Sequence, residues 1–242
     1  MLALSNHSFE RGRLQRVSME STFVPKMVCR PSHGRDSIKI AIFAGLHGDE
    51  EAGISACYEL VRWAWNEPEE LNDYLLHVFP VCNPTGRQAG TRHSHSGLDL
   101  NREFWRGSEQ AEVVYLENEL RHEKYEGIIS LHSDDTSDGV YGFVSGALLS
   151  EHLLEPALRA ASTVLPRNHA NEIDGFRAER GIIREGYDGV LCASPEQNPR
   201  PLEIVFETPA HAPLPLQVEA SVLAVKSILA EYRELQAFAA NL

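Results

Sequence analysis

Short strand-like segments and longer helix-like segments alternate along this chain, and the alternation limits the folds that it can adopt. Apolar runs bounded by turn residues predict five strands, at Ile38–Ala44, Leu75–Val81, Gly127–Leu131, Tyr141–Val144 and Leu202–Phe206. Apolar residues at helical spacing predict helices between and after these runs, at Glu50–Trp65, Ser108–His122, Leu148–Val164 and Leu216–Phe238. This order predicts an α/β fold in which a sheet with parallel strands is covered by helices.

Composition and charge narrow the class of protein further. The 242 residues are 43% hydrophobic and 24% charged, which is ordinary for a globular protein, and we expect one domain over residues 1–242. The net charge of −13 argues against a nucleic-acid partner, because such a surface would be basic. No run approaches the roughly 18–20 apolar residues of a membrane span. Met1–Arg30 lacks the apolar core of a secretory signal, so a cytoplasmic location is the default expectation.

Two segments rich in Gly, Asn and Pro, Ser94–Gly97 and Asn168–Pro201, are predicted to be long surface loops. Loops of that length in a compact domain are often functional. The four cysteines are scattered and form no Cys-x-x-Cys pair. We therefore expect core thiols, neither a disulfide framework nor a zinc knuckle, at Cys29, Cys57, Cys82 and Cys192.

A histidine and a glutamate stand three residues apart directly after the predicted strand Ile38–Ala44. Gly45 and Gly48 allow a tight turn there, so His47 and Glu50 are predicted on the loop at the carboxyl end of that strand. Open α/β sheets bind ligands at this edge. The pair could hold a metal ion, although a His-x-x-Glu spacing also arises by chance.

A second histidine, His132, ends another apolar run and is predicted at the same edge of the sheet. With His47 and Glu50 it would supply two imidazoles and one carboxylate, the ligand set of catalytic zinc sites that leave one position open for water. The alternative is a histidine that is simply hydrogen-bonded at a strand end. The neighbouring Asp134 or Asp135 would orient an imidazole or cap the next turn.

Glu207 follows the predicted strand Leu202–Phe206. A glutamate at the end of an apolar strand suits a general base that takes a proton from metal-bound water. The alternative is a carboxylate that faces solvent.

An asparagine and an arginine, Asn101 and Arg102, stand side by side in the middle of the chain. A guanidinium group is a planar fork that matches a carboxylate, and the adjacent amide could donate to the same anion. The pair could therefore bind a terminal carboxylate. The alternative is a helix-capping asparagine beside a surface arginine.

In this order, these pieces resemble the zinc carboxypeptidase family, together with the related succinylglutamate desuccinylase and aspartoacylase group and the murein peptide amidases. The resemblance extends over residues 45–209, most of the chain. The matching pieces are Gly45–Glu50, Asn83–Pro84 with Gly86, Gly90–Arg92, Asp99–Arg102, Leu131–Ser133 and Phe206–Pro209.

The resemblance implies a role for each matching residue. His47, Glu50 and His132 would hold one Zn²⁺ ion. Arg92 would polarise the scissile carbonyl, Glu207 would be the general base, and Asn101 with Arg102 would bind the carboxylate of the substrate. The implied fold is a mixed, mostly parallel eight-stranded sheet sandwiched between helices, of the phosphorylase/hydrolase-like type.

The resemblance also implies a reaction, the hydrolysis of an amide bond next to a C-terminal carboxylate by a zinc metallocarboxypeptidase. A small peptide would be the substrate, with neither a nucleic acid nor a membrane as partner. An N-acyl amino acid deacylase of the succinylglutamate desuccinylase/aspartoacylase type is the alternative. Deacylases of that type carry a β-rich segment after the catalytic glutamate, whereas this sequence continues with a turn and one predicted helix. An inactive binding module would lack a ligand or the base, and neither is missing.

One feature of the pancreatic-type peptidases has no marked counterpart in this sequence. Those enzymes use a mobile-loop tyrosine near the substrate carboxylate. Tyr187 and Tyr141 are the candidates for it, and a packing role is the alternative for each.

Overall fold

A mixed sheet forms the centre of the computed structural model, which describes residues 17–20, 23–31, 37–71 and 73–239. Its four central strands, β4, β3, β5 and β10, are parallel. In sheet order the strands are β1 (Val17–Glu20), β2 (Lys26–Cys29), β4 (Tyr74–Phe79), β3 (Ile38–Ala44), β5 (Gly127–Asp134), β10 (Leu202–Pro209), β6 (Tyr141–Gly146), β9 (Ile182–Ile183), β8 (Phe176–Glu179) and β7 (Glu172–Ile173). Beyond the centre, every neighbouring pair except β6–β9 is antiparallel.

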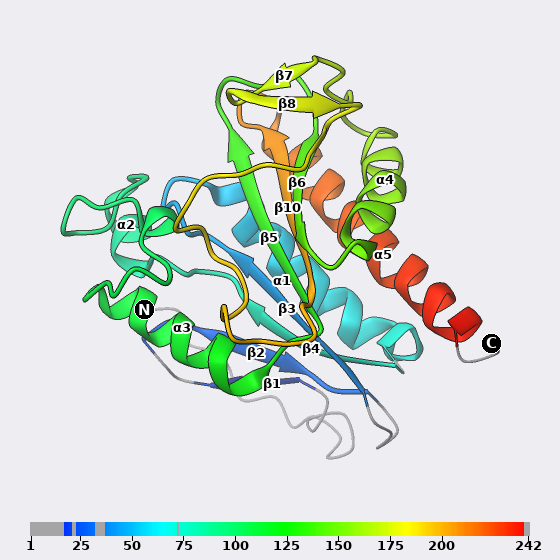
Figure 1. Ribbon diagram of the computed structural model, residues 1–242, viewed down its shortest axis with the longest axis horizontal. Coiled ribbons are helices and arrows are strands. Elements are labelled where there is room, and N and C mark those ends of the chain that lie inside the picture. The colour runs from blue at the N-terminus through cyan, green and yellow to red at the C-terminus, as the bar shows by residue number, and fades with distance from the viewer. Residues whose placement is uncertain (1–16, 21–22, 32–36, 72, 240–242) are drawn as a thin grey trace.

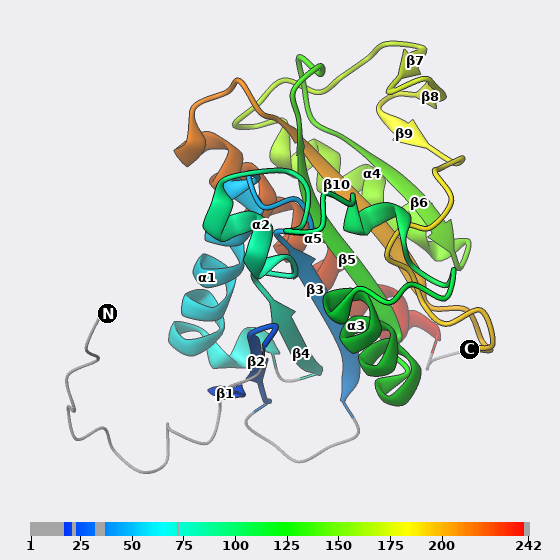
Figure 2. The same cartoon turned by 90° about the vertical axis from the view of Figure 1, so that its left-hand side faces the viewer.

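Helices cover both faces of this sheet. Figures 1 and 2 show α1 and α3 on opposite sides of β3, and α4 and α5 on the same side as α1. The helices are α1 (Glu51–Asn66), α2 (Pro84–Ala89), α3 (Ala111–Glu123), α4 (Leu149–Ala161) and α5 (Leu214–Ala239), with short 3-10 helices η1 (Pro68–Leu71) and η2 (Leu100–Arg102). The predicted α/β class, with a mixed sheet between helices, is confirmed.

Burial on both faces explains why the central strands are continuous apolar runs. In β3, Ile40 and Ile42 belong to the core that also contains α1, α4 and α5, whereas Ala41 and Phe43 belong to the core under α3. All four are fully buried. Burying a side chain of the size of Ile or Phe contributes about 1.5–3 kcal/mol, so a charge at Ile42 would disrupt the sheet.

The edges of the sheet differ from the predictions. The segment Asn168–Pro201, predicted as loop, contains the three short strands β7, β8 and β9. The turn between β7 and β8 is formed by Asp174 and Gly175, both with positive φ, and the strands are too short and polar for an apolar pattern to reveal. β1 and β2 were not predicted either, because each has only four residues. The sheet therefore has ten strands among the described residues, against the eight that the resemblance implies.

The two halves of one sheet face are covered differently, and this creates the cavity of the molecule. On that face α3 packs over the β4 and β3 half, where Tyr125 and Glu119 contact His77 of β4. The other half, over β5, β10 and β6, is crossed by the segment that leads from β9 to β10, with the β7–β8 hairpin at one end (Figure 1). A cavity lies between this half and the covering segment.

Among the described residues no helix combines the length and the apolar character that crossing a membrane requires. Two predictions concern residues 1–16, which lie outside the described ranges. They are the single domain over residues 1–242 and the absence of a secretory signal in Met1–Arg30. Both stay predictions.

Candidate metal centre and substrate cavity

The loop that carries His47 contains glycines, and one of them lets the backbone of the α2 segment approach closely. Gly45 has a φ of +62°, a left-handed conformation that glycine adopts without strain. A Cβ at Gly48 would lie 2.0 Å from the backbone carbon of Gly86, so only glycine fits there. Gly86 itself lies in the first turn of α2, whose cap Asn83 accepts a hydrogen bond from the Gly86 N–H at 2.8 Å. The α2 segment thus fixes the loop in place.

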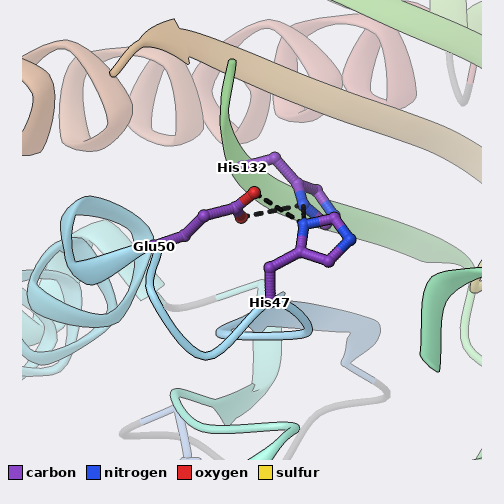
Figure 3. A group of neighbouring side chains, drawn as sticks. All are labelled: His47, Glu50 and His132. Carbon is purple, nitrogen blue, oxygen red and sulfur yellow. Dashed lines mark hydrogen bonds and ion pairs between the residues drawn. The ribbon is translucent and has the colours of Figure 1, made fainter. Parts of the chain in front are cut away.

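Three predicted metal ligands converge at the carboxyl edge of β3 and β5 (Figure 3). His47 lies on the loop after β3, Glu50 is the N-cap residue of α1, and His132 lies in β5. Glu50 Oε1 is 2.6 Å from His47 Nδ1, and Glu50 Oε2 is 3.0 Å from His132 Nδ1. The two Nδ1 atoms are 3.3 Å apart. All three side chains are buried.

The outer nitrogen of each imidazole has its own partner. His47 Nε2 is 3.2 Å from Asp99 Oδ1, and His132 Nε2 is 3.0 Å from the Ser130 hydroxyl oxygen. With Nε2–H donating to these oxygens, each neutral ring keeps a lone pair on Nδ1. The two Nδ1 lone pairs and the Glu50 carboxylate then face one another without a hydrogen-bond donor among the three groups. A bound cation would satisfy all three.

The pKa values of Glu50 and His47 are set by burial and by the groups that these side chains contact. Burial raises the pKa of Glu50, but His132 and His47 outweigh burial and lower it to about 2. Burial lowers the pKa of His47, but the hydrogen bonds to Asp99 and Glu50 outweigh it and raise that pKa above its ordinary value. Glu50 is therefore ionised at neutral pH, as a metal-ligating carboxylate must be.

The donor set fits zinc. Two imidazole nitrogens and one carboxylate oxygen are the protein ligands of a class of catalytic zinc sites. Each imidazole also has a hydrogen-bond acceptor behind it, the usual support of a metal-bound histidine. The predicted triad is thus brought together by the fold.

Glu207 lies beside the triad, in the middle of three adjacent strands. It is in register with His132 of β5 on one side and with Tyr141 of β6 on the other. β10 continues to Pro209, so Glu207 lies inside the strand and not at its end as predicted. The side chain is partly buried and lines the cavity. Burial and the carboxylates of Glu50 and Asp134 raise its pKa well above the ordinary value.

Arg92 reaches the same place from the loop after α2. Its Nε and Nη2 donate to Asp99 Oδ2 at 3.2 and 2.9 Å, and its Nη1 is 3.3 Å from His47 Nδ1. The side chain is 42% exposed, so its guanidinium remains accessible from the cavity. Asp99 therefore holds both a predicted ligand and the predicted carbonyl-polarising residue, a role that the sequence prediction did not give it.

Asn101 and Arg102 line the cavity as predicted. Asn101 is not the cap of η2, because that role belongs to Asp99, whose Oδ1 accepts a hydrogen bond from the Asn101 N–H. Its side-chain oxygen accepts the N–H of Leu191 at 2.9 Å. The Arg102 guanidinium stacks 3.9 Å from the ring centre of Tyr187.

The two candidate tyrosines both line the cavity. Tyr187 donates to Asp174 Oδ1 at 2.9 Å and stacks on Arg102, so it lies beside one of the two residues predicted to bind a carboxylate. Tyr141 is buried and donates to Asp134 Oδ2 at 2.9 Å. Asp134 also accepts from the N–H and hydroxyl of Thr136, so it caps the turn, while Asp99 and Ser130 contact the imidazoles.

The cavity that unites these residues has a volume of about 900 Å³. His47, Glu50, His132, Glu207, Arg92, Asn101 and Arg102 all line it. Every residue predicted for the site therefore faces one space, large enough for a ligand of drug size.

Sequence comparison with known families gives one match. The sequence model of the succinylglutamate desuccinylase/aspartoacylase catalytic domain matches residues 36–176. None of the curated proteins matches the chain.

Solved structures resemble this one over most of its length. A protein named as a metallopeptidase from Shewanella denitrificans OS217 has a TM-score of 0.73 at 20% identity, covering 90% of this chain and 86% of that one. A metallo-carboxypeptidase from Burkholderia cenocepacia has a TM-score of 0.69 at 14% identity, with 91% and 66% covered. A metallo-carboxypeptidase from Pseudomonas aeruginosa, in complex with (2-guanidinoethylmercapto)succinic acid, has a TM-score of 0.67 at 16% identity, with 91% and 64% covered. At these identities the likeness is one of fold.

Proposed function

The chain belongs to the succinylglutamate desuccinylase/aspartoacylase catalytic-domain family, and from this premise we propose that it is a zinc-dependent hydrolase of the carboxypeptidase type. It would hydrolyse an amide bond next to the C-terminal carboxylate of a small substrate. One observation carries the proposal: the ligand triad, Glu207, Arg92 and the Asn101–Arg102 pair line a single cavity.

His47, Glu50 and His132 would hold the zinc ion through Nδ1, a carboxylate oxygen and Nδ1. When bound, zinc supplies Lewis acidity and lowers the pKa of a bound water toward ~7. Asp99 and Ser130 would keep the two imidazoles in the tautomer that binds metal, because each accepts a hydrogen bond from Nε2–H.

Glu207 would accept the proton of the attacking water and return it to the departing amine. Its position in register with His132 supports this role, because it places the carboxylate next to a ligand. The carboxylate of Glu50 is one cause of the raised pKa of Glu207. A cation held by Glu50 would offset that contribution and favour the ionised, basic form of Glu207 at neutral pH.

Arg92 would donate to the carbonyl oxygen as negative charge develops on it. Asp99 restrains the guanidinium through two hydrogen bonds and so orients it before the substrate arrives. Loss of one such donor typically costs about 10²–10³ in rate.

Asn101 and Arg102 would hold the substrate carboxylate. The Asn101 side-chain oxygen already accepts a backbone N–H, which leaves the amide nitrogen as its donor. Stacking on Tyr187 restrains the Arg102 guanidinium, and its Nη1 donates to the Asn101 carbonyl oxygen at 2.8 Å. The remaining N–H groups would meet the substrate carboxylate.

A deacylase is the second candidate, because the family model that matches is named for two deacylases. An N-acyl amino acid also offers an amide bond next to a carboxylate, so the same residues could act on it. The two candidates differ in the group on the acyl side of the bond, which is an amino-acid residue in one and a simple acyl group in the other.

A substrate panel separates the candidates. Purified protein would be stripped with a chelator, reloaded with zinc, and assayed on C-terminal dipeptides, a murein tripeptide and N-acyl amino acids. We expect peptide hydrolysis that disappears with the chelator and returns with zinc. Turnover of the N-acyl amino acids alone would replace the peptidase by the deacylase, and metal-independent turnover would exclude both.

A further inference from the structure

Three adjacent strands form the floor of the cavity, and their registers arrange its residues in rows. His132 of β5 lies beside Glu207 of β10, which lies beside Tyr141 of β6. A second row crosses the same strands four residues before Glu207 in β10, which is about 13 Å away at ~3.3 Å per residue. This row consists of Ile128, Glu203 and Ser145, and all three residues line the cavity.

The carboxylate of Glu203 lies at this deep end. The residue is only 5% exposed. Its Oε1 accepts hydrogen bonds from the Ala193 N–H at 2.8 Å and from Arg200 Nη2 at 3.0 Å. Its Oε2 accepts one from the Ser145 hydroxyl at 2.8 Å. A carboxylate oxygen has two lone pairs, so Oε2 retains capacity for a donor that enters from the cavity.

A short segment links Glu203 to the proposed carboxylate-binding residue Asn101. The N–H of Leu191 donates to Asn101 Oδ1 at 2.9 Å, and the N–H of Ala193 donates to Glu203 Oε1 at 2.8 Å. These two backbone nitrogens are two residues apart, which is at most about 7 Å along a chain. With the two hydrogen bonds added, Asn101 Oδ1 and Glu203 Oε1 are at most about 13 Å apart, so a substrate residue whose carboxylate is held at Asn101 needs a long side chain to reach Glu203.

The lining between these two polar ends includes apolar side chains. Val205 lies midway between Glu207 and Glu203 on the same face of β10, and Ile128 and Leu191 flank the deep end. Methylene groups of a substrate side chain would pack against them, and its terminal group would meet the acceptors at the deep end.

We propose that Glu203 is a specificity-determining residue, which selects substrates whose carboxylate-bearing residue has a long side chain ending in an amino or guanidino group. The inference rests on the proposed function, because it requires the carboxylate at Asn101 and Arg102. Cationic donors form the strongest hydrogen bonds to a buried carboxylate. Arg200 is ion-paired with the opposite oxygen and is 37% exposed, so it competes with the substrate cation from outside the cavity.

The test uses two substrates with the same acyl group, one ending in lysine and one in norleucine, which has the same straight carbon chain without the amine. For the zinc-loaded wild-type protein we expect kcat/KM to favour lysine by about 10-fold to 100-fold, the range for a hydrogen bond to a charged group. Glu203→Gln should bring this ratio to within about threefold of one.

Arg200→Gln is the second variant. It distinguishes a role of Glu203 in substrate selection from a purely structural role of the Glu203–Arg200 ion pair. Removing the competing cation should raise the lysine-to-norleucine ratio, the opposite sign to Glu203→Gln. A merely structural role for the ion pair would lower both rates together in both variants and leave the ratio unchanged. Glu112→Gln serves as the control, because Glu112 is buried but does not line the cavity, and its ratio should equal that of the wild type.

The outcomes distinguish this inference from the function on which it rests. Hydrolysis of both substrates with equal efficiency by the wild type, or a ratio unaffected by Glu203→Gln, would overturn the inference and leave the peptidase proposal intact. Preference for a substrate that ends in glutamine over one that ends in lysine would also overturn it, because the group that meets Glu203 would then be a neutral amide. Hydrolysis of no peptide at all would contradict the proposed function itself.

Discussion

Two clusters of histidine and glutamate lie on the same face of the sheet, and they differ in whether a lysine or arginine of the protein pairs with their carboxylates. In the cavity cluster (His47, Glu50, His132) the ligand atoms face one another, and no lysine or arginine nitrogen is recorded bonding to Glu50 among the described residues. Arg92 Nη1 lies 3.3 Å from His47 Nδ1 of this cluster but does not bond to its carboxylate. In the α3 cluster (His77, Glu119, Glu123) the Lys26 ammonium is 2.7 Å from Glu119 Oε1, and Lys39 Nζ is 2.9 Å from Glu123 Oε2.

A metal site can be recognised by the groups that surround its ligand atoms. Both clusters bring three potential ligand atoms within 4.8 Å of one another. In the α3 cluster, however, Tyr125 donates to Glu119 and contacts His77 Nδ1 at 2.7 Å, so its acceptors are already satisfied. Only the cavity cluster combines converging lone pairs with access to a cavity, and we expect zinc there and not under α3.

The largest expected effect comes from the proposed base. Glu207→Gln removes the proton acceptor, and kcat should fall about 10²–10⁴-fold. Zinc content should be unchanged, because Glu207 is not a proposed ligand. Glu119→Gln is the matched control on the same sheet face, and its kcat should stay close to the wild-type value. Steady-state kinetics and metal analysis of both variants check this, and full activity in Glu207→Gln would refute the base assignment.

A smaller effect is expected from the support of His47. Asp99→Asn weakens the acceptor behind His47 Nε2, and zinc affinity should fall about 10–100-fold, as is typical for the partner of a metal-bound histidine. Competition with a chromogenic chelator measures this affinity. If Asp99→Asn bound zinc as tightly as the wild type, Asp99 would be only the partner of Arg92.

The α3 cluster should contribute stability in place of metal. Burial raises the pKa of Glu119, but its contacts with His77, Lys26 and Tyr125 outweigh burial and lower it to about 2. Because the folded pKa lies below the unfolded value, the stabilisation is present above about pH 4.5 and is lost as pH falls toward 2. Glu119→Gln should therefore cost about 2 kcal/mol at pH 7, and the gap should close near pH 2. Urea unfolding at both pH values measures it, and a constant gap would contradict the ion-pair account.

The smallest effect concerns the pH dependence of activity. The pKa of Glu207 is raised by burial and by nearby carboxylates, Asp174 among them, so the acid limb of kcat/KM should lie above 4.5, the ordinary value. Activity is lost as pH falls and Glu207 is protonated. Asp174→Asn should move the limb to lower pH by a few tenths of a unit, whereas the exposed Asp188 changed to Asn should not move it. An unmoved limb in Asp174→Asn would mean that another group titrates.

The centre of the fold was predictable because burial on both faces leaves a strong apolar pattern. Runs such as Ile38–Ala44 and Leu202–Phe206 are strands for that reason, and their order determines where their carboxyl ends lie. The hairpin β7–β8 was not predictable, because Phe176–Glu179 is short, half polar and ordered by a turn and by ring contacts with Phe143 and Tyr187.

The residue types of the site were predictable, but the hydrogen bonds between its residues were less so. His47, Glu50 and His132 follow from their places near strand ends, and the structure brings them together. The link through Asp99 joins residues 52 positions apart and depends on the path of the loop between them, which no periodicity reports. An aspartate two residues before Asn101 was the available signal. Glu203 was hidden within a predicted strand, where its neighbours Ser145 and Arg200 could not be known.

Zinc content of matched histidine variants distinguishes the cavity cluster from the α3 cluster. The wild type, His132→Ala and His77→Ala would be loaded with zinc, passed through a desalting column and analysed for metal per chain. We expect one zinc ion per chain in the wild type and in His77→Ala, and loss of that ion in His132→Ala. Zinc retained in His132→Ala and lost in His77→Ala would place the metal under α3 and contradict its assignment to the cavity cluster.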